Sequence, residues 1–268
     1  MLDLKPITIC EKRMGAHMEY LDFLVELHGN AERQGPGGDE QTRRAVELSG
    51  LANKQGLRIA DIGCGTGASV LTLAKMLDAE ITAVDFLPAF LTELSLRAAS
   101  NGVFDRITTV EASMDKLEFE PSSFDAIWSE GAIYNIGFEA GVRDWRQYLK
   151  PNGILAVSEL TWLTDTRPQD LERFWNAAYP EVGTASEKLS VLERNGYTPL
   201  GYFPLPKECW MENYYHPVRR KLNSMRVKYN DSEVVPKYVE QELEEIRLYE
   251  AHSDYVSYGF YIAKKLTD

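Results

Sequence analysis

Three glycines, each separated from the next by one residue, follow a short apolar stretch. This feature most constrains the fold of the chain. The stretch Leu57–Ile62 has the length of a β-strand, Gly63, Gly65 and Gly67 come after it, and a helix-length segment begins at Ser69. A strand that is joined to a helix by a glycine turn is typical of doubly wound α/β proteins, where the turn and the helix N-terminus contact a nucleotide-like ligand. The same turn is also built where no ligand binds, so the glycines alone leave the function open.

Strand-length apolar runs alternate with helix-length segments through the middle of the chain. Pro88 suits the first turn of a helix, and the turn Pro151–Gly153 stops the helix that precedes it. Parallel strands joined by right-handed crossovers have this order, so we expect an α/β fold with a doubly wound, mostly parallel, Rossmann-like sheet. The predicted strands are Leu57–Ile62, Ile81–Phe86, Ile107–Val110, Phe124–Trp128 and Ile154–Leu160, and the predicted helices are Ser69–Leu77, Pro88–Ser100 and Glu139–Leu149.

The region before the first strand is predicted to be helical. Helices are expected at Ala16–His28 and at Asp39–Leu51, with Asp39 as the N-cap of the second, and the glycine-rich link Arg33–Gly38 separates them. We therefore expect an N-terminal helical cap or lid over residues 1–56 and a main domain over residues 57–268.

Helical stretches between Pro168 and Arg194 lead to two last strands, Tyr197–Phe203 and Tyr255–Lys264. A helical insertion is predicted between these strands, at about residues 205–253. If the last strand is antiparallel, the insertion leaves and re-enters the sheet at one edge and overhangs the ligand mouth. One of its helices is two-sided, with Val235, Val239, Leu243 and Ile246 on the apolar face and Glu240, Glu242, Glu244 and Glu245 on the rest.

Acidic residues on both sides of the glycine turn narrow the choice of ligand. Asp85 ends the second strand, twenty residues after Gly65, where an acid accepts hydrogen bonds from ribose hydroxyls. A helix N-cap before Pro88 is the alternative interpretation of Asp85. Ala68 completes a G-x-G-x-x-A pattern, so NAD(P) or a flavin is considered, but Asp61 argues against a pyrophosphate. A carboxylate there repels phosphate and favours a cationic sulfonium amino acid.

The run Asp61-Ile62-Gly63-Cys64-Gly65-Thr66-Gly67 resembles the first motif of the class I S-adenosylmethionine-dependent methyltransferases. The turn Leu149–Leu155 and the strand Phe124–Trp128 are similar to two later motifs of that family, and the resemblance extends over most of Leu57–Lys264. It implies a seven-stranded sheet with an antiparallel last strand and S-adenosyl-L-methionine as co-substrate. The residues that it implies for cofactor binding are Asp61, Gly63, Gly65, Gly67, Asp85, Phe86, Ser113, Met114 and Ser129.

Within the family, the chain is most similar to the quinone-biosynthesis and small-molecule methyltransferase group. The run Arg33–Gly37, taken with Trp128–Gly137, resembles a bacterial subgroup without a named substrate. The stretch Ser113–Phe119 is similar to the family segment that receives the adenine amino group, but Ser113 stands where an Asp is common. Met114 is expected against the purine ring or in the core.

Glu130 and Tyr134 follow the carboxyl end of a predicted strand and are the candidate catalytic residues. Glu130 is a candidate general base or orients a substrate amine, with a loop acid or a hydrogen bond to the cofactor's amino group as alternatives. Glu159 and Trp162 follow a similar strand end. The rings of Tyr134 and Trp162 suit cation–π contact with a sulfonium, worth about 0.5–2 kcal/mol, or core packing. Methyl transfer depends mainly on positioning, so a base is optional.

A capped, aromatic-lined pocket for a small molecule is predicted over this edge. The glycine-rich link is expected to close it from one side and the insertion from the other. Packing between the insertion and the main domain is the alternative role for the aromatic residues. Those at the start of the insertion are Trp210, Tyr214, Tyr215 and His216.

Charge and cysteine content exclude several classes of protein. A formal net charge of −12 offers no source for electrostatic binding of nucleic acid. Charged residues near the start and the lack of a long apolar window argue against a signal peptide or stable membrane insertion. Cys10, Cys64 and Cys209 are far apart and suggest no disulfide framework. His and Cys show no metal-ligand spacing, so no metal site is expected, and a cytoplasmic location fits.

The sequence thus predicts a methyltransferase (EC 2.1.1.-) that moves a methyl group to a small-molecule acceptor by in-line displacement. Two alternatives stay open. One is a protein that binds S-adenosylmethionine without turnover, and the other is an NAD(P)-dependent oxidoreductase. The acceptor, its reacting atom and the oligomeric state are not indicated by the sequence.

Overall fold

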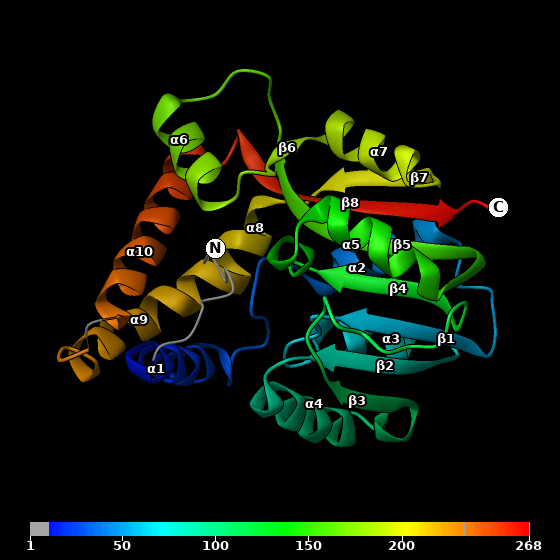
Figure 1. Ribbon diagram of the computed structural model, residues 1–268, viewed down its shortest axis with the longest axis horizontal. Helices are drawn as coiled ribbons and strands as arrows, with labels where there is room; N and C mark the ends of the chain where they lie inside the picture. Colours follow the sequence, from blue (N-terminus) through cyan, green and yellow to red (C-terminus); the bar gives the residue numbers. More distant parts are fainter. Residues whose placement is uncertain (1–10, 233, 268) are drawn as a thin grey trace.

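A mixed sheet forms the centre of the molecule (Figure 1). The computed structural model describes residues 11–232 and 234–267, so Cys10 lies outside the described residues. Within these residues seven strands form a continuous path in the order β3-β2-β1-β4-β5-β8-β7. The strands are β1 (Leu57–Ile62), β2 (Ala79–Asp85), β3 (Ile107–Glu111), β4 (Phe124–Glu130), β5 (Leu149–Trp162), β7 (Tyr197–Pro204) and β8 (Val256–Lys265).

The strand directions confirm the predicted sheet. Neighbours from β3 to β5 pair in parallel, whereas β8 pairs antiparallel with both β5 and β7. A two-residue strand, β6 (Gly183–Thr184), adds a parallel pairing at the end of β5 and was not predicted. The carboxyl ends of β1, β2 and β4 therefore meet at one edge, which is where an open α/β sheet binds its ligands.

Helices cover both faces of the sheet. Ile59 and Ile81 share a core cluster with α2, α3 and α4, whereas Ala60 and Ile62 share a second cluster with α5 and α7. Alternate residues of β1 thus face opposite layers, as period-2 geometry requires. The helices outside the insertion are α1 (Glu11–His28), α2 (Asp39–Ser49), α3 (Ala68–Met76), α4 (Pro88–Ser100), α5 (Phe138–Trp145), α6 (Gln169–Ala178) and α7 (Ala185–Arg194).

Two predicted boundaries are wrong for identifiable reasons. The N-cap of α2 is Gly38, whose extended backbone leaves Asp39 inside the first turn. There the Asp39 carboxylate accepts a hydrogen bond from Arg33, and the positive end of the helix dipole stabilises its negative charge. The predicted helix Glu139–Leu149 ends at Trp145, and Leu149 already pairs with Phe124 as the first residue of β5.

The helical insertion lies beyond the carboxyl ends of the parallel strands, next to α1 (Figure 1). Tyr20 of α1 stacks on Tyr238 with ring centroids 4.1 Å apart, and Lys221 donates to the Leu27 carbonyl oxygen at 2.8 Å. The insertion comprises α8 (Lys207–Trp210), the π-helix η4 (Met211–Tyr215), α9 (His216–Lys228) and α10 (Val235–His252).

The two N-terminal helices have different neighbours. α1 packs on the insertion, whereas α2 packs on the sheet through buried Thr42, Ala45 and Val46. The cap over residues 1–56 and its boundary stay predictions. None of the helices in residues 11–232 and 234–267 combines the length and apolar character needed to span a bilayer.

Candidate active site

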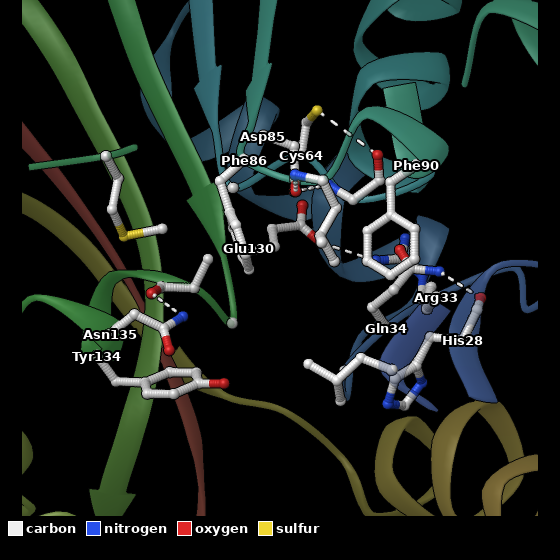
Figure 2. A pocket seen from close by; sticks show the side chains of 18 of the residues that line it. His28, Arg33, Gln34, Cys64, Asp85, Phe86, Phe90, Glu130, Tyr134 and Asn135 are labelled. Carbon is white, nitrogen blue, oxygen red and sulfur yellow. Dashed lines mark hydrogen bonds and ion pairs between the residues drawn. The ribbon is translucent and has the colours of Figure 1, made fainter. Parts of the chain in front are cut away.

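A cavity of about 660 Å³ lies at the carboxyl edge of the parallel strands, between the sheet and the helical layer of α1 and α10. This volume falls in the range of about 300–1,000 Å³ usual for small-molecule sites. Figure 2 shows Tyr134 and His28 on opposite sides of the open space, with Asp85 and Glu130 at one end.

The glycine turn forms one wall of this cavity. Gly63 and Gly65 line it, with φ of 76° and 54°, a left-handed conformation that L-residues with a side chain rarely adopt. A Cβ on Gly63 would lie 2.4 Å from the Cβ of Ala132. Gly67 does not belong to the lining, because it is the N-cap of α3 and faces Leu94. Two of the three predicted glycines therefore present backbone to the cavity.

Asp85 lies within this wall and holds the turn in place. One carboxylate oxygen, Oδ2, accepts from the Gly65 amide at 2.9 Å, and Oδ1 accepts from the Leu87 amide at 3.0 Å. The second bond is an Asx turn, and the alternative interpretation of Asp85 as the helix cap is wrong, because Leu87 is the N-cap of α4 and no side chain caps that helix. Burial raises the pKa of Asp85, while these amide donors act in the opposite direction. Each oxygen keeps a further lone pair, and Phe86 beside it is exposed and lines the cavity.

Asp61 is buried beneath the turn and does not line the cavity. Its Oδ2 accepts from the Ser69 hydroxyl at 2.5 Å, whereas its Oδ1 has no hydrogen-bond partner. Burial raises the pKa of Asp61 to about 8. Ser69 does line the cavity and is the contact between Asp61 and that space. Most buried carboxylate oxygens accept a hydrogen bond, so Oδ1 of Asp61 is an exception.

The segment after β3 supplies the wall next to the glycine turn, since a Cβ on Gly63 would lie 3.2 Å from the Met114 methyl carbon. Ser113, Met114 and Asp115 all line the cavity, and the Ser113 hydroxyl donates to the Asp115 carboxylate. The carboxylate that the sequence lacks at residue 113 is therefore present two residues later. Trp145 fixes the Met114 backbone by donating to its carbonyl oxygen at 3.0 Å.

Glu130 joins β4 to the glycine-rich link. Its Oε2 accepts from Arg33 at 2.9 Å, and its Oε1 accepts from Thr42 at 2.6 Å and from Trp128 at 2.9 Å. Both side chains of the ion pair are less than a tenth exposed. With three donors on its carboxylate, Glu130 is arranged to position the link, and its role as a base stays a prediction.

The link also reaches the glycine turn and the insertion. Gln34 accepts from the Thr66 amide at 2.9 Å, and its side-chain amide donates to the Thr66 hydroxyl. Asn213 of η4 donates to the Gly37 carbonyl oxygen at 2.7 Å. Arg33, Gln34, Gly35 and Pro36 of the link line the cavity, and closure of the link over a bound ligand stays a prediction.

Several predicted site residues lie outside the cavity lining. Ser129 is fully buried and donates to the Ile62 carbonyl oxygen at 2.7 Å, which ties β4 to β1. Trp162 packs beneath the Arg167 guanidinium at 4.5 Å from its ring centroid. Glu159 is buried 3.6 Å from Lys188, and burial raises its pKa to about 7.

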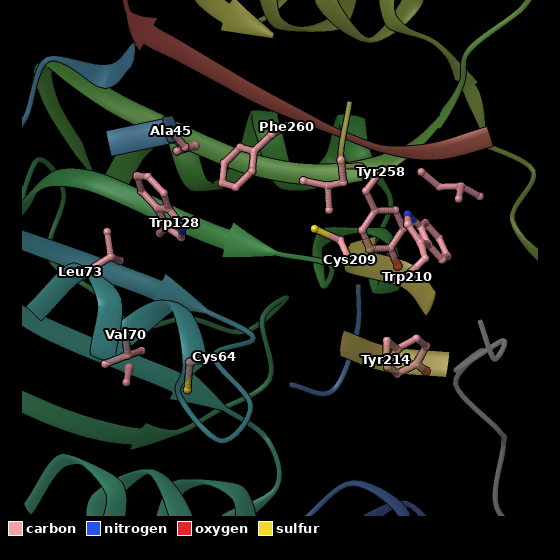
Figure 3. Packing of buried hydrophobic residues seen from close by; sticks show 14 of the residues in the cluster. Ala45, Cys64, Val70, Leu73, Trp128, Cys209, Trp210, Tyr214, Tyr258 and Phe260 are labelled. Carbon is pink, nitrogen blue, oxygen red and sulfur yellow. The ribbon is translucent and has the colours of Figure 1, made fainter. Parts of the chain in front are cut away.

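Of the aromatic residues predicted to cap the pocket, only Tyr214 lines it. Trp210 stacks on Tyr249 at 4.5 Å and fills the junction between the insertion and β8 (Figure 3). Tyr215 is fully buried, and His216 faces solvent beside Glu212. The alternative interpretation, interface packing, holds for Trp210 and Tyr215. The further aromatic rings of the lining are those of Tyr20, Phe86, Phe90, Tyr134 and Tyr258.

Glu242 and Glu245 were predicted on the outer face of their helix, but both are buried and line the cavity. Leu243, predicted on the apolar face, is only half-buried. The spacing carries a signal for this, because Glu242 is seven residues after Val235 and three after Val239. That position falls in the apolar stripe of an α-helix.

Comparison with known proteins agrees with this geometry. Residues 59–153 match the family model described as a methyltransferase domain. The match covers the glycine turn and the strands β1 to β4, and the fold is similar to that of a solved S-adenosylmethionine-dependent methyltransferase. Among the residues that the structure describes, no three His, Cys, Asp or Glu side chains gather to hold a metal ion.

Individual relatives are distant. A sterol 24-C-methyltransferase of Gibberella zeae is 29% identical over 119 residues, which cover 44% of this chain and 31% of that protein. The chain spans less than two thirds of the length of the curated relatives that it matches first.

Solved structures share the fold over nearly the whole chain. A methyltransferase from Geobacter sulfurreducens, solved with S-adenosyl-L-homocysteine, has a TM-score of 0.76 at 19% identity and covers 90% of this chain and 97% of its own. The [4+2]-cyclase SpnF has a TM-score of 0.75 at 18% identity and covers 98% of both chains. Because this fold also occurs in a cyclase, the activity has to be argued from the site.

Proposed function

We propose that the protein is an S-adenosylmethionine-dependent methyltransferase that methylates a small molecule. The observation that carries the proposal is the bond from the Gly65 amide to Asp85 inside one cavity. This bond supports the proposal because the glycine backbone and the carboxylate proposed to bind ribose lie side by side, as the family motif implies. The placement within the quinone-biosynthesis and small-molecule group stays a prediction.

The walls of the cavity suit the methyl donor. Gly63 and Gly65 offer backbone for the amino-acid part, and Asp85 keeps lone pairs for ribose hydroxyls. A cationic group near Ser69 would favour an ionised Asp61, whose Oδ1 has no donor. Bound S-adenosylmethionine supplies a methyl group on a sulfonium that needs no further activation.

The role of the protein's own residues is to position the reactants and to exclude water. Arg33 holds the link against Glu130, and Gln34 holds the link against Thr66 of the glycine turn. Correct placement of two reactants is worth roughly 7–11 kcal/mol of barrier. Burial raises the pKa of Tyr134 far above neutrality, so its phenol stays protonated and can donate to an acceptor atom. Glu130 and Tyr134 are therefore proposed as a positioning residue and an orienting residue, respectively.

A small molecule is the acceptor that this cavity favours. α1 and the insertion cover it, and a volume of about 660 Å³ has to hold both donor and acceptor. The net charge of −12 gives no electrostatic support for nucleic acid.

The test is to measure release of S-adenosylhomocysteine from S-adenosylmethionine across a panel of amines, alcohols, thiols, carboxylic acids and phenols. Acceptor-dependent release is expected, and a reaction without acceptor serves as the control. Binding without release for every class would favour the non-catalytic alternative. Saturable NAD(P) binding without S-adenosylmethionine binding would favour an oxidoreductase.

A further inference from the structure

The wall opposite the glycine turn carries two carboxylates that the proposed reaction does not yet use. Glu242 and Glu245 lie three residues apart on α10, both line the cavity, and they are 7% and 4% exposed. Glu245 accepts a hydrogen bond from the Tyr215 hydroxyl at 2.8 Å. The Oε2 of Glu242 is buried and accepts none. A buried acceptor without a donor is the position that a ligand N–H would satisfy.

The surroundings of Glu242 hold acids and phenols. Glu245 faces it from the same helix, and in residues 11–232 and 234–267 no lysine or arginine pairs with it. Burial and Glu245 raise the pKa of Glu242 to about 7, so its carboxyl exchanges a proton near neutral pH. The phenols that face it from the other elements are those of Tyr20, Tyr134, Tyr214, Tyr215 and Tyr258.

Aromatic rings complete this wall. Tyr20, Tyr134, Tyr214 and Tyr258 line the same cavity, and tyrosine faces attract organic cations. His28 stacks near Tyr214, with ring centroids 6.0 Å apart, and burial lowers its pKa to about 4. A neutral imidazole at pH 7 does not repel a cation. Aromatic rings and carboxylates in one wall form a site for a protonated amine.

We propose that the methyl acceptor is an organic amine, bound as its ammonium form by this wall and deprotonated by Glu242. The inference rests on the proposed function and specifies its substrate class. The ammonium N–H bond breaks, its proton goes to Oε2 of Glu242, and the bonding pair stays on nitrogen. That pair forms the new N–C bond while the methyl C–S bond breaks and leaves its pair on sulfur. A carboxylate acceptor would instead meet two like charges.

Binding of matched probes tests the proposal without turnover. Calorimetry on the full chain saturated with S-adenosylhomocysteine compares phenethylamine, 2-phenylethanol and phenylacetate. We expect phenethylamine to bind about tenfold more tightly than the alcohol, and Glu242→Gln to remove that advantage, because a charge-assisted hydrogen bond is lost. Glu240→Gln, an exposed change on the same helix, should leave both affinities within about twofold.

A second readout needs no variant. Phenethylamine binding to the unmodified protein should strengthen between pH 6 and pH 8 as Glu242 ionises, while 2-phenylethanol binding stays flat. Equal affinities for amine and alcohol, or an equal effect of Glu242→Gln on both, would overturn the amine assignment. Methyl transfer to alcohols or carboxylic acids but never to amines would do the same. Failure of S-adenosylhomocysteine to bind would instead contradict the proposed function.

Discussion

Gly63 shows how single residues fix the ligand wall. Its φ of 76° disfavours any side chain, and a Cβ at this position would lie only 2.4 Å from Ala132, so there is no room for one. The glycine spacing and Asp85 were predicted from the sequence because local motifs determine them. The burial of Asp61 under Ser69 was not predictable, since spacing does not show which side of a turn a carboxylate faces.

Gly63→Ala should destabilise the protein more than Gly102→Ala. Both glycines have positive φ, so both substitutions cost about 1–2 kcal/mol. Only Gly63 adds a steric clash, because no atom lies within 4 Å of a Cβ at Gly102, and overpacking adds about 1–3 kcal/mol. Urea unfolding of the two variants measures the difference, and equal losses would contradict the close packing.

Asp85→Ala should weaken S-adenosylhomocysteine binding by roughly 1–3 kcal/mol, since the bond to the Gly65 amide and the proposed bonds to ribose are lost together. Asp85→Asn keeps one acceptor oxygen and should lose less. Calorimetric titration measures both variants. Unchanged affinity in a folded Asp85→Ala protein would refute the ribose assignment.

At the scale of elements, the link Arg33–Gly38 and helix α10 decide the shape of the site. The period of apolar residues predicted nearly all helices and strands, because burial imposes that period. This prediction misplaced Glu242 and Glu245, because it expects every charged residue to face solvent, even one that falls within the apolar stripe of a helix. The cavity behind α10 arises only when the insertion folds back over the sheet.

Arg33→Met should lower the free energy of unfolding by roughly 3–5 kcal/mol, because it leaves the Glu130 carboxylate buried without its cation. Arg143→Met is the matched control, since its pair with Asp144 is more than half exposed, and it should change stability by less than about 1 kcal/mol. Chemical denaturation compares them. A loss no greater than that of the control would show that the link is not held by this ion pair.

Glu242→Gln should alter the pH dependence of stability. The folded pKa of about 7 lies above the ordinary value of 4.5, so the cost of ionising Glu242 is absent below about pH 4.5 and complete above about pH 7. Relative to the unmodified protein, the variant should gain roughly 2 kcal/mol between pH 5 and pH 8. Asp61 and Glu159 titrate alike in both proteins. A difference that does not vary with pH would contradict an ionisable Glu242 at this site.

At the scale of the whole molecule, the cavity joins segments that are far apart in the sequence. Asp85 is the last residue of β2, Glu130 is the last residue of β4, and Glu242 comes from the insertion between β7 and β8. The sheet order was predictable from the alternation of elements, so the glycine turn and Asp85 could be placed together. The insertion was also predicted to overhang this edge, but the residues of α1 and α10 that line the cavity were not, because tertiary packing alone decides which side chains face it.

The proposed recognition of an adenosyl amino acid by the glycine turn and Asp85 underlies every other function proposed for this cavity. Calorimetric titration of the full chain with S-adenosylhomocysteine, alongside NAD⁺ as a comparison ligand, measures that recognition. Saturable binding of S-adenosylhomocysteine at one molecule per chain, with no binding of NAD⁺, is the predicted result. Absence of S-adenosylhomocysteine binding by the folded protein would contradict it.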